Sequence, residues 1–253
     1  MGKLLLHSVV AVLLTLLTQI GGIAWLGALT FRRYVLAFVL IYSALSLVTT
    51  WVAPIFGRTP LSCTASGPLR VQSLLYCALN RNYVRPELED VLVDLAKALD
   101  QSHPGTLVQV LDANFPFLDG FPLIPHLSHD DGEKVDIAFF YAEQGHYLPG
   151  ATRSPIGYFA FEEGPTRCPR TWPSLRWDLG MLQPLWRKLE VDIPRTREAV
   201  VRLAQDRRVG KLFLEPHLQR ALGVAHQKVR FQGCNAARHD DHVHVQLRYG
   251  RDY

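Results

Sequence analysis

Two long stretches without charged side chains occupy the N-terminal part of the chain. Asp, Glu, Lys and Arg are absent from residues 4–31 and from residues 34–57, and only two arginines separate the stretches. Because about 20 apolar residues in a helix cross the hydrocarbon core of a bilayer, this pattern predicts a transmembrane helical hairpin with spans near 5–28 and 34–54.

A secretory signal peptide and a buried helical pair in a soluble protein are the alternatives to a hairpin. Lys3 followed by an apolar run is typical of a signal peptide, but the run is longer than a signal core and a second apolar run follows at once. Arg32 and Arg33 lie in the short connection, and short basic connections stay in the cytoplasm. We therefore expect a protein of the inner membrane whose chain ends face the periplasm, although Lys3 and Arg58 reduce the contrast in charge.

Beyond residue 57 the pattern changes to that of a folded domain, so we divide the chain into a helical hairpin, residues 1–57, and a domain, residues 58–253. The turn-forming residues at 57–66 predict a short linker. Apolar positions at helical spacing predict a helix from Pro86 to Asp100, and we expect further helices at 178–189, 195–207 and 217–222. Alternating or strongly β-forming runs predict strands at 106–115, 135–141, 210–216 and 242–249, and 143–171 is expected to be a long loop. This order of elements is typical of an α+β domain with a small, mainly antiparallel sheet.

Composition and cysteine usage narrow the class of protein. The chain has 253 residues, 48% of them hydrophobic, with a net charge of +4 and no basic run interleaved with aromatic residues, so we expect no nucleic-acid partner. All four cysteines lie after the predicted spans, and their even number suits disulfides in an oxidising compartment. Three pairings are possible, and four buried free thiols are the alternative.

The sequence RHDDHVHVQLRY, residues 238–249, concentrates histidines at the start of a predicted strand. Residues two apart on a strand face the same side, so His242 and His244 project together while the valines between and after them face the core. His239 lies one turn-like step earlier. A single histidine here would be explained as a hydrogen-bonded polar residue, but the cluster favours a metal site.

A second group of candidate ligands comes from PHLSHDDGEKVDIAF, residues 125–139. Asp136 lies in an apolar strand, where a carboxylate needs a partner, and a metal ion would supply one. The alternatives are an arginine partner or a turn cap. His129 precedes it by seven residues, and the role of His126, in the same loop, is left open. Zinc usually takes three protein ligands and keeps one position for water. The spacing does not decide whether His242 or His244 is the third ligand.

Four segments in order resemble the penicillin-insensitive murein endopeptidases, within the class of metallopeptidases that includes lysostaphin, the D-Ala-D-Ala peptidases and the hedgehog fold. The matching segments are NRNYVRPELEDVL (80–92), HLSHDDGEKVDI (126–137), KLFLEPHLQRAL (211–222) and KVRFQGCNAARHDDHVHVQL (228–247). The loop before His126, the acidic residues after His129 and the segment after residue 230 depart from the family pattern. The resemblance therefore specifies the chemistry more closely than the bond that is cleaved.

The resemblance implies that residues 58–253 form a zinc metallopeptidase domain that hydrolyses the peptide cross-links of peptidoglycan. It implies that Zn²⁺ is bound by His129, Asp136 and His244, and that His242 is the general base. His126 and His239 then line the site, and His239 is a candidate for stabilising the oxyanion. For Cys234 we expect a disulfide, because three protein ligands already suffice.

Two other functions remain open at this point. The first is a non-catalytic zinc-containing module that binds or regulates at peptidoglycan. The second is a non-haem iron oxygenase, which also uses two histidines and a carboxylate.

Overall fold

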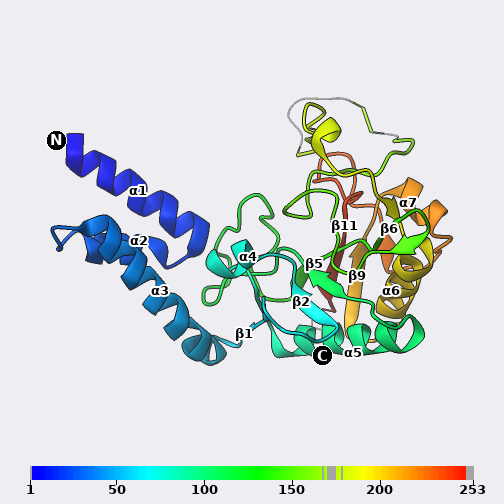
Figure 1. The fold of residues 1–253 in the computed structure, drawn as a ribbon, viewed down its shortest axis with the longest axis horizontal. Coiled ribbons are helices and arrows are strands. Elements are labelled where there is room, and N and C mark those ends of the chain that lie inside the picture. Colours follow the sequence, from blue (N-terminus) through cyan, green and yellow to red (C-terminus); the bar gives the residue numbers. More distant parts are fainter. Residues whose placement is uncertain (1, 167, 170–174, 178, 249–253) are drawn as a thin grey trace.

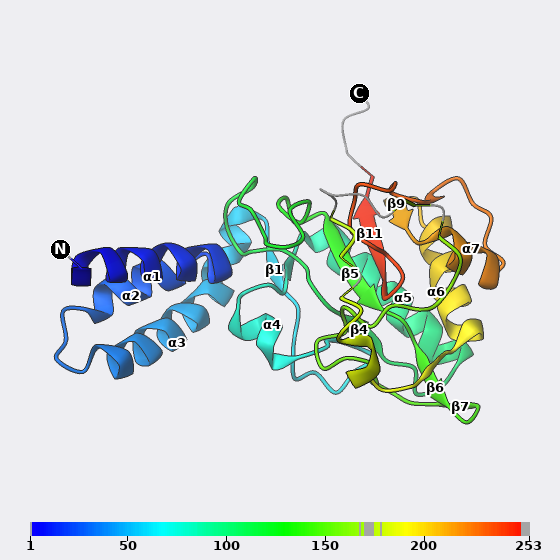
Figure 2. The same ribbon diagram turned by 90° about the horizontal axis from the view of Figure 1, so that it is seen from above.

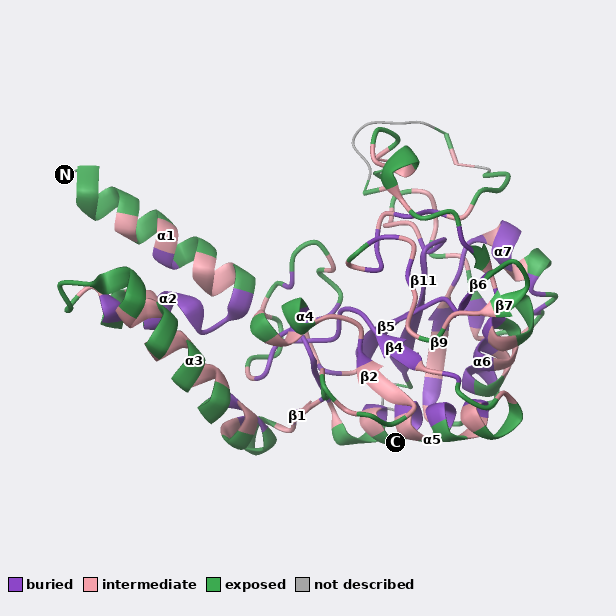
Figure 3. Cartoon of the chain, in the orientation of Figure 1, coloured by how far each residue is buried: buried purple, intermediate pink, exposed green. Residues whose placement is uncertain are grey.

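The computed structural model describes residues 2–166, 168–169, 175–177 and 179–248, which form a mixed α+β structure. Three apolar helices lie at one end and a sheet with its covering helices at the other (Figures 1 and 2). The N-terminal helices are mostly exposed, whereas the strands at the centre of the sheet are buried (Figure 3). The helices at the N-terminal end are α1 (Gly2–Thr18), α2 (Gly21–Ala28) and α3 (Tyr34–Val52), and α3 continues into the 3₁₀ turn η1 (Ala53–Phe56).

The predicted hairpin of two spanning helices is not confirmed, because the first predicted span, 5–28, is two helices. Gln19 adopts a left-handed conformation with φ of 66°, and the chain reverses there, so that α2 packs against α1. A Cβ atom on Gly22 would lie 2.0 Å from the Thr15 hydroxyl, so glycine is what allows this close approach. One helix, Tyr34–Phe56, is long and apolar enough to cross a membrane among the residues described.

The domain is built on a six-stranded sheet with the order β10-β9-β11-β5-β4-β2. The four central strands pair in antiparallel fashion, and the two outer strands pair in parallel fashion with their neighbours. The sheet is therefore mainly antiparallel, as expected, with parallel pairing at its two edges. Its strands are β2 (Leu69–Val71), β4 (Val108–Val110), β5 (Lys134–Ala138), β9 (Val209–Phe213), β10 (Val229–Arg230) and β11 (His242–Leu247).

Two amphipathic helices, α5 (Pro86–Ser102) and α6 (Ile193–Gln205), pack against each other and against the sheet. The predicted apolar positions of α5 are all buried, which confirms the helix expected from Pro86. Proline at the start of each helix suits the first turn, where the missing N–H would have no helical partner. Two shorter helices, α4 (Leu74–Ala78) and α7 (Pro216–Ala221), complete the helical part of the domain, and α7 matches the expected helix at 217–222.

Three expectations for the connecting segments were wrong. The segment 57–66 is not a free linker, because β1 (Thr59–Pro60) pairs with β3 (Tyr83–Val84). The predicted helix at 178–189 is only the 3₁₀ turn η2 (Gln183–Leu185) within its described part, 179–189. The segment 143–171 is not a plain loop over its described residues, because β7 (His146–Tyr147) pairs with β6 (Tyr141–Glu143), which also pairs with β8 (Glu190–Val191).

All four cysteines form disulfides, which settles the pairing that the sequence left open. Cys63 is bonded to Cys77, and Cys168 is bonded to Cys234. The alternative of four free thiols is thus wrong. The second disulfide ties the segment after residue 166 to the chain just before β11.

The packing of α5 gives a prediction about stability. Leu99 is fully buried in the main core, whereas Lys97, two residues earlier, is exposed. We expect Leu99→Ala to lower the free energy of unfolding by about 2–5 kcal/mol, because it removes buried apolar contacts and leaves a cavity. Lys97→Ala should change it by less than about 0.5 kcal/mol. Thermal unfolding of the purified chain, followed by near-ultraviolet circular dichroism, measures both; equal shifts would contradict this packing.

Candidate metal centre

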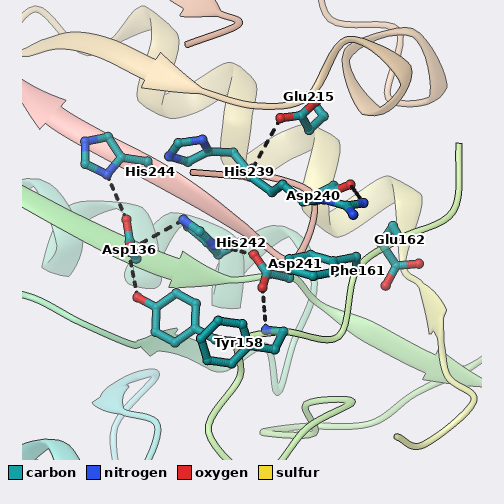
Figure 4. Close-up of polar contacts among 12 residues, drawn as sticks. Asp136, Tyr158, Phe161, Glu162, Glu215, His239, Asp240, Asp241, His242 and His244 are labelled. Atoms are coloured by element: carbon teal, nitrogen blue, oxygen red, sulfur yellow. Dashed lines mark hydrogen bonds and ion pairs between the residues drawn. The ribbon is translucent and has the colours of Figure 1, made fainter. Parts of the chain in front are cut away.

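The candidate centre begins with a cross-strand pair at the middle of the sheet. Strands β5 and β11 are antiparallel, and their register places Asp136 directly opposite His244. Side chains directly opposite each other point to the same face of a sheet. The His244 ring nitrogen Nδ1 lies 2.8 Å from Asp136 Oδ1, as Figure 4 shows. The neighbouring residues Val135 and Val245 point into the core on the other face and are fully buried.

His129 joins this pair from the loop before β5. Its Nδ1–H donates to the Ala113 carbonyl at 2.9 Å, which leaves Nε2 to face the strand pair. This Nε2 lies 3.1 Å from His244 Nδ1 and 3.4 Å from Asp136 Oδ1. A ring nitrogen fixed by a hydrogen bond from the other nitrogen is the usual arrangement of a metal-binding histidine.

These three atoms have the spacing of ligands around one ion. A tetrahedral site with bonds of about 2.0–2.2 Å places its ligand atoms roughly 3.3–3.6 Å apart. The three distances here, 2.8, 3.1 and 3.4 Å, lie within or somewhat below this range. The group His129, Asp136 and His244 is buried, offers two nitrogens and one oxygen, and could hold a metal ion. Of the two histidines that the sequence left undecided, the structure brings His244 into the group.

The second oxygen of Asp136 is held by groups that the sequence did not single out. The hydroxyl of Tyr158 donates to Asp136 Oδ2 at 2.6 Å, and the backbone N–H of Asp112 donates to the Tyr158 hydroxyl at 3.1 Å. Tyr158 comes from the segment predicted to be a loop, and its side chain is buried beside the centre. Asp136 is therefore fixed on both oxygens.

His242 lies next to the three ligand candidates and not among them. Its Nδ1 is 2.5 Å from Asp241 Oδ1, and its Nε2 lies 3.5 Å from Asp136 Oδ2. Asp241 is held in turn by the backbone N–H of Phe159, which donates to its other oxygen at 2.6 Å. Figure 4 shows this chain of contacts from the loop through Asp241 to His242. The imidazole is thus oriented with one nitrogen anchored and the other facing the centre.

His126 has a parallel arrangement on another side of the centre. Its Nδ1 lies 2.7 Å from Asp112 Oδ2 and 3.7 Å from Asp136 Oδ2. Asp112 is bound through both oxygens by Arg81, at 2.6 Å each. The structure therefore brings His126 into the site, and a buried ion pair holds it there.

His239 is buried against the other histidines. Its ring centre lies 5.0 Å from that of His242 and 5.6 Å from that of His244, and Phe213 packs beside it. The backbone N–H of Glu215 donates to the His239 carbonyl, and the Glu215 carboxylate forms a salt bridge with Arg176. Burial and the neighbouring histidines keep the pKa of His239 well below its ordinary value, so its ring is neutral at neutral pH.

Burial and neighbouring charges shift the pKa values of the residues at the centre in different directions. Burial raises the pKa of Asp136, but the His242 and His129 charges outweigh it and hold that pKa well below its usual range. Burial lowers the pKa of His242, yet the Asp136 and Asp241 carboxylates raise it to about 9. Burial lowers the pKa of His244 to about 4, which keeps its nitrogens free of a second proton. For His129, Asp136 outweighs burial and raises the pKa above its ordinary value.

A cavity of about 290 Å³ opens beside the centre. His126, Asp241 and His242 line its polar side. Most of its other walls are apolar. Five of these residues, Ile124, Pro125, Leu127, Phe159 and Phe161, come from the two segments that the sequence left as loops, and Leu175 and Trp177 follow the second of them. The cavity is thus suited to hold an organic group next to His242.

The structure places all six predicted site residues in one buried cluster, and it adds Tyr158, Asp112, Asp241 and Arg81. Asp112 carries the same signal as Asp136, a carboxylate inside a run that is predicted to be a strand, so the sequence could have indicated it. Asp241 adjoins His242 in the histidine-rich segment. Tyr158 has no local signal, because no periodic pattern surrounds it. The disulfide of Cys234 agrees with the expectation that this cysteine is not a ligand.

Comparison with known proteins gives no family for the chain. No family model matches it, and no curated protein matches it.

The contact between Tyr158 and Asp136 predicts an effect on metal affinity. We expect Tyr158→Phe to weaken metal binding about 10–100-fold, because it removes the hydrogen bond that orients the ligand carboxylate. Tyr147→Phe is the matched control, since the Tyr147 hydroxyl accepts from the Leu107 backbone N–H away from the centre. Competitive titration with a chromophoric chelator measures both. Equal affinities for the two variants would contradict the role of Tyr158.

The raised pKa of His129 predicts that metal affinity depends on pH. At a pH below that pKa the ring carries a second proton, which a metal ion has to displace. We therefore expect affinity to fall as the pH falls from 8 to 6, by about tenfold per unit for each displaced proton. Calorimetric titration in buffers of different ionisation enthalpy measures both affinity and proton release. An affinity that stays constant over this range would contradict the ligand assignment of His129.

Proposed function

We propose that the chain is a zinc-dependent endopeptidase that hydrolyses peptide cross-links of peptidoglycan. The observation that carries the proposal is the buried group His129, Asp136 and His244 with His242 held beside it. The four segments that resemble the penicillin-insensitive murein endopeptidases support the same function, because they supply these residues in the family's order.

The donor set favours zinc among divalent ions. Two imidazole nitrogens, one carboxylate oxygen and an open fourth position are typical of catalytic zinc sites. A bound zinc ion would lower the pKa of water toward about 7 and polarise a carbonyl group. Asp136 supplies the negative charge of the site, and Tyr158 keeps its carboxylate oriented.

His242 is the residue we assign as general base. Asp241 holds its Nδ1, so that Nε2 is the nitrogen free to accept a proton at the centre. The pKa of about 9 is set by the Asp136 and Asp241 carboxylates. This pKa is expected to fall toward neutrality once the Asp136 charge is shared with a cation, which would give His242 the protonation state of a base. After accepting the proton, His242 can return it to the leaving amine.

His239 and His126 have distinct roles in this proposal. His239 is neutral and buried, so a ring N–H can donate to the oxygen that becomes negative during hydrolysis. His126 is bound to Asp112 through Nδ1 and lines the cavity, where it can contact the substrate. The apolar walls of the cavity would exclude water from the group beside the scissile bond.

The proposed location is the inner membrane, with the domain facing the periplasm. The connection that contains Arg32 and Arg33 lies at the end of the helices away from the sheet domain, as does the N-terminus near Lys3 (Figure 2). Basic residues favour the cytoplasmic side, so the domain would lie on the opposite side. Both disulfides suit an oxidising compartment. In this proposal α3 spans the membrane, and α1 and α2 pack beside it in place of a second span.

Two substitutions separate metal binding from catalysis. We expect His129→Ala to abolish both bound zinc and hydrolysis, because it removes a ligand. We expect His242→Ala to keep zinc and to lose activity by about 10²–10⁴-fold, the usual contribution of a general base. Cross-linked muropeptides incubated with the full chain, followed by liquid chromatography and mass spectrometry, report the release of monomers.

His146→Ala is the matched control, because His146 is exposed in β7 and contacts only its own turn. Full activity of His242→Ala would show that the base assignment is wrong. Binding of muropeptides without release of monomers by the zinc-loaded wild-type chain would favour the non-catalytic module.

A further inference from the structure

The sheet domain contacts α3 along its side and not only at its end. The hydroxyl of Tyr42 donates to the Ala78 carbonyl, the last residue of α4, at 2.5 Å. The side-chain amide of Asn80 donates to the same hydroxyl at 3.1 Å. Tyr42 lies roughly 14 residues, or about 20 Å of helix, before the end of the apolar span at Phe56. The domain element α4 is therefore level with the interior of the helix Tyr34–Phe56, which is long enough to cross a bilayer.

Further contacts hold the loop after β4 against the same helices. The Phe117 backbone N–H donates to the Gln19 side-chain oxygen at 3.0 Å, and the Phe117 ring lies 5.0 Å from the Phe56 ring. Asn80 also reaches the Thr18 carbonyl at 3.4 Å. Figures 1 and 2 show α4 on the side of the domain nearest to α1 and α3. The helices are thus joined to the domain along its flank and do not act as a stalk.

Large apolar side chains are exposed beside these contacts. Leu74 and Leu75 at the start of α4 are 66% and 46% exposed, and Leu118, next to Phe117, is 57% exposed. Ile124 and Leu127 in the same loop are also about half exposed. Asp119, which follows Leu118, is paired with Arg58 and Arg85, so its charge is compensated. Clusters of exposed apolar residues mark interaction sites.

We propose that Leu74, Leu75, Leu118, Ile124 and Leu127 form an apolar rim that inserts among the acyl chains of the lipid bilayer beside α3. The depth of Tyr42 along α3 selects lipid as the occupant, because a helix that crosses the bilayer carries α4 with it to the level of the acyl chains. Transfer of exposed apolar side chains from water to the acyl chains stabilises such an arrangement. This inference rests on the membrane anchor proposed above, and not on hydrolysis.

The rim has a consequence for the candidate metal centre. Ile124 and Leu127 belong both to the rim and to the cavity beside His126 and His242. The mouth of the cavity then faces the membrane, so substrate reaches the centre from the membrane side. A substrate there is the part of the cell wall closest to the membrane, or a peptide attached to it.

The apolar rim can be tested by measuring how deep single labelled positions lie in a lipid bilayer. The full chain with its disulfides formed would carry one added cysteine, Leu75→Cys or Leu118→Cys, labelled with an environment-sensitive nitrobenzoxadiazole dye. Each labelled chain is placed in nanodiscs of phosphatidylethanolamine and phosphatidylglycerol with nitroxide-bearing acyl chains. We expect both labels to be quenched about twofold or more by the lipid nitroxide and to be protected from aqueous iodide.

Two control positions make the outcomes distinct. Leu40→Cys lies on the exposed face of α3, and its label shows whether α3 is in lipid. Lys97→Cys lies at an exposed position of α5, and its label is the reference for a position in water. If positions 75 and 118 behave like 97 while 40 is quenched by lipid, the rim is wrong and the anchor stands. If position 40 is also quenched only by iodide, the anchor fails and the rim with it. Labels at 75 and 118 shielded from both quenchers would show a protein cover, such as a second copy, and would overturn the inference.

Discussion

A carboxylate buried inside an apolar sheet has to be compensated, and the Asp136 carboxylate imposes this constraint on its surroundings. An uncompensated charge in such a position is strongly destabilising. Two imidazoles face one oxygen, and a tyrosine hydroxyl and two further imidazoles face the other. The compensating groups come from β11, from the loop before β5 and from the segment before residue 160. The same carboxylate therefore orders three distant parts of the chain and supplies the negative charge that a cation would bind.

The two faces of the central strands carry different residues: apolar side chains of the core lie on one face, and the candidate metal ligands lie on the other. Val135, Val243 and Val245 fill the core on one face, and Asp136 and His244 lie on the other. A β-strand separates the two groups of side chains without any irregularity, because successive residues alternate between its faces. His242 and His126 are each fixed by a carboxylate, Asp241 in the first case and Asp112 in the second. Fixed rings need little rearrangement when a proton or a substrate arrives, which is the advantage of a rigid scaffold for catalysis.

The N-terminal helices contact residues that lie close in sequence to those of the centre. Arg58, the second residue after the 3₁₀ turn that ends the helical part, is buried, and a Cβ atom on Gly132 would lie 2.6 Å from its guanidinium carbon. Gly132 lies between His129 and Asp136, so the start of the domain packs beneath the loop that carries both. Asn80 contacts the helices, and Arg81 holds Asp112. The position of the N-terminal helices and the arrangement of the centre are therefore linked through the adjacent residues Asn80 and Arg81.

The sequence by itself determined the local features whose signals are periodic or compositional. The charge-free N-terminal stretches, the helix from Pro86, the valine-backed strand of His242 and His244, and the isolated carboxylate Asp136 could all be predicted, because alternation and helical spacing are properties of neighbouring residues. Only the tertiary structure decided that the first apolar stretch folds back at Gln19, which disulfides form, and that His244 faces Asp136. It also brought Tyr158 and Asp112 to the centre. These outcomes depend on strand register and on loops that close over long distances in the chain, and no local pattern encodes which residues meet.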